Sequence, residues 1–426
     1  MRFIMMNVMK KEIKYMVLKK LGIIGLLLCI TVLSFAQTSN DVKNHYNPLS
    51  TGVPSLLISP DARAGGMGDV GVATSPDINS QHWNPAKYAF AESVAGASLS
   101  YTPWLRKIVK DIDLVYLSGY YKFLGPQAVS MSLRYFSLGE ISLTDNEGNP
   151  MGTGKPNEFS IDVAYSRQLS KHFSMAVAMR YIYSNLSAKD ENYYPGHAFG
   201  ADIAMYAHIP LMIPTGESLL GVGLNISNIS TKISYDKGET PGIFLPANMR
   251  LGIAYTVPFD AYNKLSMSFD INKLLVPAYP QMSNYVDTTG ILDNDAYETA
   301  KKKYNRSSVA GIFYSFADAY DNPKNTTAKD GFMEELREIN WSAGLEYSYN
   351  NQFFVRTGYS NESKWKGNRK YFTFGAGFKF TAFQLDVGYV LALAQTSPLD
   401  QTLRFGLSFD VDGLRDLVDM AERRKK

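Results

Sequence analysis

The chain has 426 residues, of which 13% are aromatic, 19% are charged and 33 are glycine. So many large apolar side chains exclude a disordered chain, and a mean hydropathy of −0.16 with one long apolar stretch excludes a bundle of membrane-spanning helices. An aromatic- and glycine-rich chain of low average hydropathy suits an all-β membrane barrel, in which apolar and polar residues alternate along each strand.

Residues 1–36 have the features of a secretory signal peptide. Lys19 and Lys20 precede an apolar run over residues 21–35, which ends at the small residue Ala36. Translation could start at Met1 or at Met16, because residues 16–36 alone make a complete signal. The only cysteine, Cys29, lies inside this segment. We therefore expect a mature chain with no thiol for disulfides, catalysis or metal binding.

Cleavage after Ala36 also changes the charge of the protein. It removes six basic residues and one acid, so the net charge of +3 becomes −2. A slightly acidic mature chain offers no electrostatic basis for binding nucleic acid.

Residues 93–411 repeatedly alternate between apolar and polar side chains with a period of two. Residues 129–135, 173–183 and 403–409 show the pattern clearly, with Ser, Gly, Asp, Asn and Arg opposite large apolar residues. A soluble β-sandwich alternates in the same way. However, runs of about nine to twelve residues suit tilted membrane strands, and tyrosine and phenylalanine gather near the strand ends. We therefore predict a transmembrane barrel over residues 93–411.

The lengths of the connections predict fourteen strands. Short and long connections alternate without conflict only if residues 309–318 are not a spanning strand, which makes residues 276–338 one large extracellular loop. The short connections are 124–126, 169–172, 209–217, 258–263 and the turns near 350 and 381, and the long ones are 102–111, 137–156, 187–196, 229–245, 361–369 and 395–401. Since bacterial barrels have even strand numbers and short periplasmic turns, we predict a 14-stranded antiparallel barrel with both ends in the periplasm.

Two segments are expected to lie outside the barrel wall. Residues 37–92, rich in Gly, Pro, Ser, Asp and Asn, suit an N-terminal plug or hatch. Residues 412–426 form the tail, in which Leu414, Leu417, Val418 and Ala421 share one helical face, so a short C-terminal periplasmic helix is predicted. Residues 66–71 match the pattern G-x-G-x-x-G, but they lack the strand before it and the helix after it that a dinucleotide site requires. We interpret them as tight turns of the plug.

No catalytic, cofactor-binding or metal-binding residues are predicted. The five histidines lack the spacing of metal ligands, and no serine is marked as a nucleophile. Ten charged residues fall on the polar face of the strands and are expected to point into the lumen. The default interpretation is that they form charge pairs that hold the wall and the plug together. The alternative is that they line a path for a solute. They are Arg134, Asp162, Arg180, Asp202, Arg250, Asp270, Glu346, Arg356, Asp386 and Arg404.

Several stretches carry a family resemblance. Residues 61–69 and the element Trp83-Asn84-Pro85-Ala86 resemble the FadL-like outer-membrane barrels, which have fourteen strands and an N-terminal hatch with a similar Asn-Pro-Ala element. Residues 52–63, 100–105, 269–277 and 366–369 look like those of the PorV (LptO) family of the type IX secretion system of Bacteroidota. The resemblance to the hatch of these barrels implies a structural role for a plug motif. This motif consists of Gly66, Gly68, Asn84, Pro85 and Ala86.

The resemblance implies an outer-membrane protein that is neither an enzyme nor the translocation pore. Such a protein would bind the C-terminal signal domain of cargo at the very large translocon barrel. It would then carry the cargo to the cell-surface sortase, which removes the signal and attaches a lipopolysaccharide anchor. The large loop supplies apolar candidates for partner contact, which are Phe313, Phe316, Phe332, Met333 and Leu336.

Two other functions stay open on the sequence. A FadL-like transporter of hydrophobic small molecules requires a continuous apolar pocket near residues 83–86, and a solidly packed lumen would argue against it. An outer-membrane lipid hydrolase, such as a lipid A deacylase, requires serine, histidine and an acid to converge at the rim, for instance around His197.

Overall fold

The computed structural model describes residues 47–426 except for residues 108, 124, 145–146, 148, 187–193, 237, 287–289, 324–326, 394–396, 398 and 416–426. The predicted signal peptide, residues 37–46 of the predicted plug and most of the predicted tail helix therefore lie outside the described residues. A helix does start at residue 411 and is described as far as residue 415.

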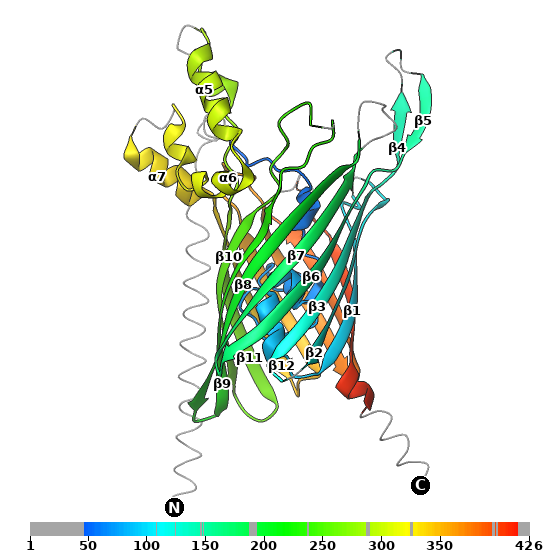
Figure 1. Ribbon diagram of the computed structural model, residues 1–426. Coiled ribbons are helices and arrows are strands. Elements are labelled where there is room, and N and C mark those ends of the chain that lie inside the picture. The colour runs from blue at the N-terminus through cyan, green and yellow to red at the C-terminus, as the bar shows by residue number, and fades with distance from the viewer. Residues whose placement is uncertain are drawn as a thin grey trace, which may run out of the picture. The chain divides into compact units, whose positions relative to one another are not determined.

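Within the described residues, fourteen antiparallel strands form a closed barrel, as the sequence predicted (Figure 1). The barrel strands are β1 Ala95–Pro103, β2 Ile112–Phe123, β3 Gln127–Leu138, β6 Asn157–Ser170, β7 Phe173–Asn185, β8 Gly196–Ile213, β9 Gly216–Ser230, β10 Asn248–Pro258, β11 Asn263–Leu274, β12 Ile339–Tyr349, β13 Phe353–Asn361, β14 Lys370–Phe380, β15 Phe383–Ala392 and β16 Leu403–Asp410. Strand β1 pairs with both β2 and β16, which closes the wall and leaves no open sheet edge.

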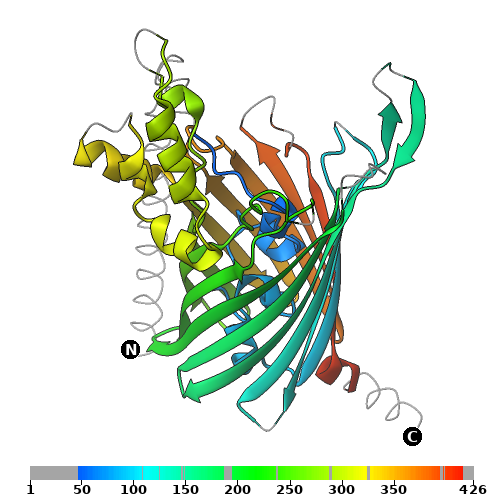
Figure 2. The same ribbon diagram turned by 45° about the horizontal axis from the view of Figure 1, so that its top comes forward.

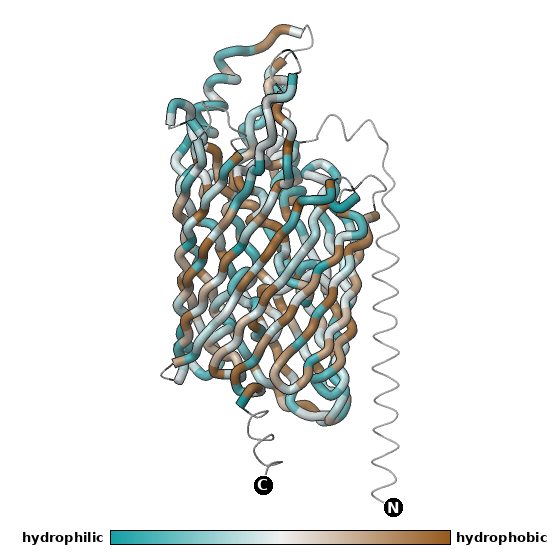
Figure 3. Tube along the Cα trace, turned by 90° about the vertical axis from the view of Figure 1, so that its right-hand side faces the viewer, coloured by the Kyte–Doolittle hydropathy of each residue, from teal (hydrophilic) through white to brown (hydrophobic). Residues whose placement is uncertain are grey.

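The strands present an apolar face outward and a polar face inward. In β1, Ser98 and Ser100 are buried toward the lumen, whereas Leu99 and Tyr101 between them are exposed on the outside. The same alternation along the other strands gives the mixed colouring of the wall in Figure 3. An apolar exterior around a polar interior is the pattern of a barrel that crosses a membrane.

The connections at the two ends of the barrel differ in length, as expected. At one end, adjacent strands are joined by short turns. The other end carries the small hairpin of β4 (Ile141–Thr144) and β5 (Pro150–Gly154) and the long insertion between β11 and β12 (Figures 1 and 2). The insertion contains η3 Met282–Asn284, α5 Asn294–Tyr304, α6 Ser308–Tyr314, η4 Asp318–Asp321 and α7 Ala328–Arg337. Residues 308–314 are thus helical, which agrees with leaving them out of the wall.

The predicted connection over residues 209–217 is wrong. Strands β8 and β9 continue as a hairpin to a two-residue turn at residues 214–215, with Ile213 opposite Gly216. Strand β8 continues through Pro210, although proline cannot donate a hydrogen bond to the ladder. The backbone N–H of His208 donates to the carbonyl of His172. The nitrogen of Pro210 lies on the same side of β8, but beyond the end of β7. The missing N–H of Pro210 therefore costs no ladder bond. At 18 and 15 residues, β8 and β9 are also longer than the predicted nine to twelve.

The segment before β1 fills the barrel lumen (Figure 2). It contains the short helices η1 Pro54–Leu57, α3 Ala62–Gly65, α4 Ser80–Trp83 and η2 Pro85–Phe90. Val70, Val72, Ala86 and Tyr88 of this plug are fully buried. No helix among the described residues combines the length and the apolar character needed to span a membrane.

Candidate functional site

The glycine-rich turn after α3 seats the plug against the wall. The backbone N–H of Gly66 ends α3 by donating to the carbonyl of Ala62. The N–H of Gly68 donates to Thr373 Oγ1 on β14 at 2.7 Å, and the N–H of Gly71 donates to Asp270 Oδ2 on β11 at 2.8 Å. Backbone donors of the plug thus pair with side chains on two separate parts of the wall.

At Gly68, an added side chain would meet both backbone strain and the backbone of the wall. Its φ of +74° lies in the left-handed region, and an added Cβ would lie 2.7 Å from the backbone nitrogen of Tyr359 and 2.9 Å from the carbonyl oxygen of Ala343. Gly125 has nearly the same φ, +73°, but nothing lies within 4 Å of its Cβ position. A comparison of substitutions at these two glycines therefore separates the effect of backbone strain from the effect of a steric clash.

We expect Gly68→Ala to destabilise the protein clearly more than Gly125→Ala. Both variants carry the conformational cost of about 1 kcal/mol, but only Gly68→Ala must also push the plug away from β12 and β13. Denaturant titration, read from the gel mobility of the folded barrel, measures the difference. Equal midpoints for the two variants would show that the plug does not depend on this close approach.

The Asn84-Pro85-Ala86 element holds the other end of the plug. Asn84 Oδ1 accepts a hydrogen bond from the N–H of Ala86 and so caps η2, while Pro85 occupies the first turn, where no N–H is needed. Asn84 Nδ2 donates to the carbonyls of Val72 in the plug and Met205 in β8, both at 2.9 Å. One side chain therefore caps a helix and ties it to the wall.

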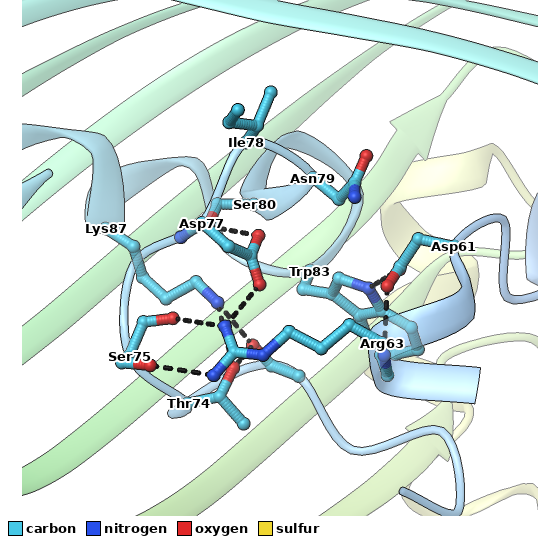
Figure 4. A network of polar contacts seen from close by, with 12 residues as sticks. Asp61, Arg63, Thr74, Ser75, Asp77, Ile78, Asn79, Ser80, Trp83 and Lys87 are labelled. Carbon is cyan, nitrogen blue, oxygen red and sulfur yellow. Dashed lines mark hydrogen bonds and ion pairs between the residues drawn. The ribbon is translucent and has the colours of Figure 1, made fainter. Parts of the chain in front are cut away.

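Arg63 connects the plug to the wall electrostatically. Its guanidinium donates to both carboxylate oxygens of Glu346 on β12, at 3.0 and 3.1 Å, and to Asp77 Oδ2 within the plug at 2.7 Å. Figure 4 shows the contacts of Arg63 with Asp77 and Ser75 beside the hydrogen bond from Trp83 to Asp61. No pattern in the sequence indicates the roles of Arg63 and Asp77, because their partners are distant in the sequence or belong to an irregular segment.

All ten charged residues expected to face the lumen are buried. Arg356 on β13 donates to Glu346 at 2.6 Å and to Asp386 on β15 at 2.5 Å, so it extends the contact made by Arg63. Arg404 reaches Asp69 of the plug at 2.8 Å. On the opposite wall, Arg180 pairs with Asp162 and Asp202. The pairs of Arg63 and Arg404 therefore join the plug to the wall, whereas those of Arg180 and Arg356 join strands of the wall to one another.

The lumen also contains a cavity of about 150 Å³ between the plug and β10–β16. Trp83 and Trp104 border it, but so do Arg250, Asp270 and Arg404. Asn84 and Ala86 beside Trp83 are fully buried. The cavity is therefore lined with charged groups, unlike the continuous apolar pocket that a transporter of hydrophobic molecules requires.

The five apolar residues proposed for partner contact lie in the insertion and are all exposed. Phe313 is in α6 and is 73% exposed, and Phe316 follows this helix. Phe332, Met333 and Leu336 lie on one face of α7, since they are spaced by one and three residues.

Helix α7 exposes its apolar face and buries its acidic face, which is the opposite of the usual arrangement in a surface helix. Phe332 is 55% exposed, Met333 42% and Leu336 44%, whereas Glu334 is only 5% exposed. Glu334 is buried because Lys366, in the connection between β13 and β14, lies 2.5 Å from its carboxylate. The sequence identified Phe332, Met333 and Leu336 as apolar candidates for partner contact, but it could not show that the charged face of α7 is the one packed against the barrel.

His197 belongs to an aromatic cluster on the outside of the wall. Its Nδ1 lies 2.7 Å from the hydroxyl of Tyr181, and its ring contacts that of Tyr183 edge-on. Such aromatic groups are typical of the girdle of a membrane barrel. The surroundings of His197 thus favour a membrane-facing position over the centre of a hydrolase.

Comparison with known proteins gives a family and similar barrels. No curated protein sequence matches the chain. Among solved structures, the chain is similar to the toluene transporter TodX of Pseudomonas putida, at 12% identity and a TM-score of 0.44 over 82% of this chain and 97% of TodX. It is also similar to a FadL homologue of Pseudomonas aeruginosa, at 10% identity and a TM-score of 0.41 over 83% and 98% of the two chains.

The model of a protein family, described as the type IX secretion system protein PorV, matches residues 40–281. The matched region runs from the plug through β11 and includes both plug elements described above. Since it covers more than half of the chain, this protein belongs to the PorV family and is an outer-membrane component of the type IX secretion system.

Proposed function

We propose that this protein is a non-enzymatic carrier of secreted cargo. It binds the C-terminal signal domain of cargo proteins at the large translocon barrel, and it delivers them to the cell-surface sortase and attachment complex beside the lipopolysaccharide. Membership of the PorV family is the observation that carries this proposal. Two features of the structure support it.

The first supporting feature is the occupied lumen. Arg63, Arg356 and Arg404 pair with carboxylates of the plug and of the wall, and the central plug residues are fully buried. A barrel filled in this way is a stable scaffold. It suits a protein that presents a binding surface better than one that conducts its cargo through the lumen.

The second supporting feature is the insertion between β11 and β12. Short turns of such barrels face the periplasm and long connections face outward, so we assign the insertion to the cell surface. Three apolar residues on the outer face of α7 are exposed there, and exposed apolar groups that gather on one element mark interaction sites. We infer that Phe313, Phe316, Phe332, Met333 and Leu336 contact the cargo domain or the translocon.

The experiment is an affinity purification of the tagged protein from gently solubilised outer membranes, with mass spectrometry of the bound proteins. The proposal predicts a very large barrel, a sortase-like protease and proteins that share a C-terminal domain. A strain that expresses the tag on an unrelated outer-membrane barrel is the control. Recovery of the protein alone, with lipid or fatty acid bound, would contradict the carrier function and favour transport.

A further inference from the structure

A cluster of buried charged groups lies where the insertion joins the barrel. Its carboxylates come from η4 and from the last turn of α7, and its lysines come from the end of β11 and from the connection between β13 and β14. The members are Lys273, Asp318, Glu334, Glu335, Glu338 and Lys366. Lys273 Nζ lies 2.9 Å from Glu335 Oε2 and 2.5 Å from Glu338 Oε2. Lys366 Nζ lies 2.5 Å from Glu334 Oε1 and 3.1 Å from Glu338 Oε1.

The negative charges in this cluster exceed the positive ones. Four carboxylates face two ammonium groups. Arg337, which lies 3.3 Å from Glu334 and is partly exposed, does not make up the difference even if it is counted in full. Buried charges are tolerated only when they are paired or bound to a cation. Of these four carboxylates, Asp318 is the one without a cationic partner in ion-pair contact among the described residues.

Asp318 has one carboxylate oxygen that is available to bind a cation. It is 8% exposed, its Oδ2 accepts a hydrogen bond from the N–H of Ala278 at 2.6 Å, and its Oδ1 has no hydrogen-bond partner among the described residues. Carboxylate oxygens of Asp318, Glu335 and Glu338 lie within 4.8 Å of one another. An additional positive charge at this point would give the carboxylate of Asp318 the cationic partner that it lacks.

On the side of Asp318 and Glu338, the cluster also borders a space large enough for water. A cavity of about 40 Å³ borders Asp318, Glu338 and Lys366. That volume exceeds the 10–15 Å³ or so that one water molecule needs. Ligands that the protein does not supply could therefore come from water.

We propose that Asp318, Glu335 and Glu338 bind one divalent cation of the Ca²⁺ type. The donor set consists only of oxygen atoms, which hard cations prefer and which Zn²⁺ and copper do not select. Ca²⁺ tolerates irregular coordination and takes water as its remaining ligands. The lysines do not block the site, because each carboxylate offers about four lone-pair positions. The positive charge of the lysines weakens cation binding, so we expect a dissociation constant of about 10⁻⁴ to 10⁻³ M.

Bound at this point, the cation joins η4 to α7. Two of its ligands are Glu335, in the last turn of α7, and Glu338, the residue that directly follows the helix. The cation would thus fix the helix that exposes Phe332, Met333 and Leu336. Cation binding itself requires no cargo, so it can be tested separately from the proposed carrier function.

The test is calorimetric titration of CaCl₂ into the purified full-length protein after removal of metals with EDTA. Asp318→Asn keeps the size of the side chain and removes its charge. Asp321→Asn is the matched control, because Asp321 lies in the same helix η4 but pairs with Lys303, outside the cluster. We expect one Ca²⁺ per chain for the wild type and for Asp321→Asn, and affinity at least about tenfold weaker for Asp318→Asn.

Limited trypsin digestion of the insertion gives a second measurement in case binding heat is small. Ca²⁺ should slow cleavage of the wild type and of Asp321→Asn but not of Asp318→Asn, while gel mobility confirms that all three barrels are folded. No binding to the wild type up to about 10 mM Ca²⁺, well above the expected range, would overturn the proposal. So would equal binding by Asp318→Asn, or a wild-type digestion rate that responds to pH but not to Ca²⁺, since a proton would then neutralise the cluster.

Discussion

Replacing Phe313, Phe332 and Leu336 together by serine is expected to abolish co-purification of cargo while the barrel stays folded. All three side chains are exposed, so the folded protein loses little when they become polar. An apolar side chain of this size contributes on the order of 1.5–3 kcal/mol when it is fully buried. If the three side chains together contribute only about 3 kcal/mol at the interface, their loss still weakens the affinity for cargo by more than about 100-fold.

The matched control is the double variant Met282→Ser and Ile291→Ser. Both residues are apolar, exposed and in the same insertion, but outside α6 and α7. The control should retain cargo, and quantitative mass spectrometry of the purified complexes compares the two. If both variants lose cargo equally, the contact is not specific to the two helices. If neither loses it, the insertion is not the binding surface.

Replacing Arg63 by alanine is expected to free the plug from the wall. The substitution removes the bidentate contact with the buried Glu346 and the contact with the partly buried Asp77, and it leaves both carboxylates with fewer partners. Breaking a buried ion pair by removing one partner costs about 3–5 kcal/mol. We therefore expect a plug that opens transiently, which planar-bilayer recordings would detect as ion conductance absent from the wild type.

Arg106→Ala is the control for this experiment. Arg106 pairs with Asp113 at 3.0 Å, but both side chains are substantially exposed, and such surface pairs contribute little to stability. Its conductance and denaturation midpoint should match those of the wild type. An Arg63→Ala protein that behaves like the Arg106→Ala protein would show that the plug is held without this charged contact.

The barrel itself could be predicted from the sequence because each strand carries its own signal. Residues 129–135 alternate strictly, and the order of short and long connections excluded residues 309–318 from the wall. The hairpin of β8 and β9 extends further than predicted and includes Pro210. Whether a proline breaks a strand depends on which side its nitrogen faces, and this is a property of the assembled sheet.

The candidate site was less predictable for a related reason. The Asn84-Pro85-Ala86 element is local and could be identified from adjacent residues. The contact between Arg63 and Glu346 spans 283 positions in the chain, and no periodic pattern connects them. In α7, helical spacing separates two faces, but only the positions of Lys273 and Lys366 determine that the acidic face is buried.

Site-specific photo-crosslinking tests most directly whether the exposed face of the insertion contacts cargo. A photoreactive phenylalanine analogue would replace Phe332 on α7 and, as a control, Phe374 on the apolar outside of β14. The account predicts that position 332 crosslinks to the C-terminal domain of a secreted protein or to the translocon, while position 374 does not crosslink to cargo. Crosslinking of position 332 to lipid alone in actively secreting cells would contradict it.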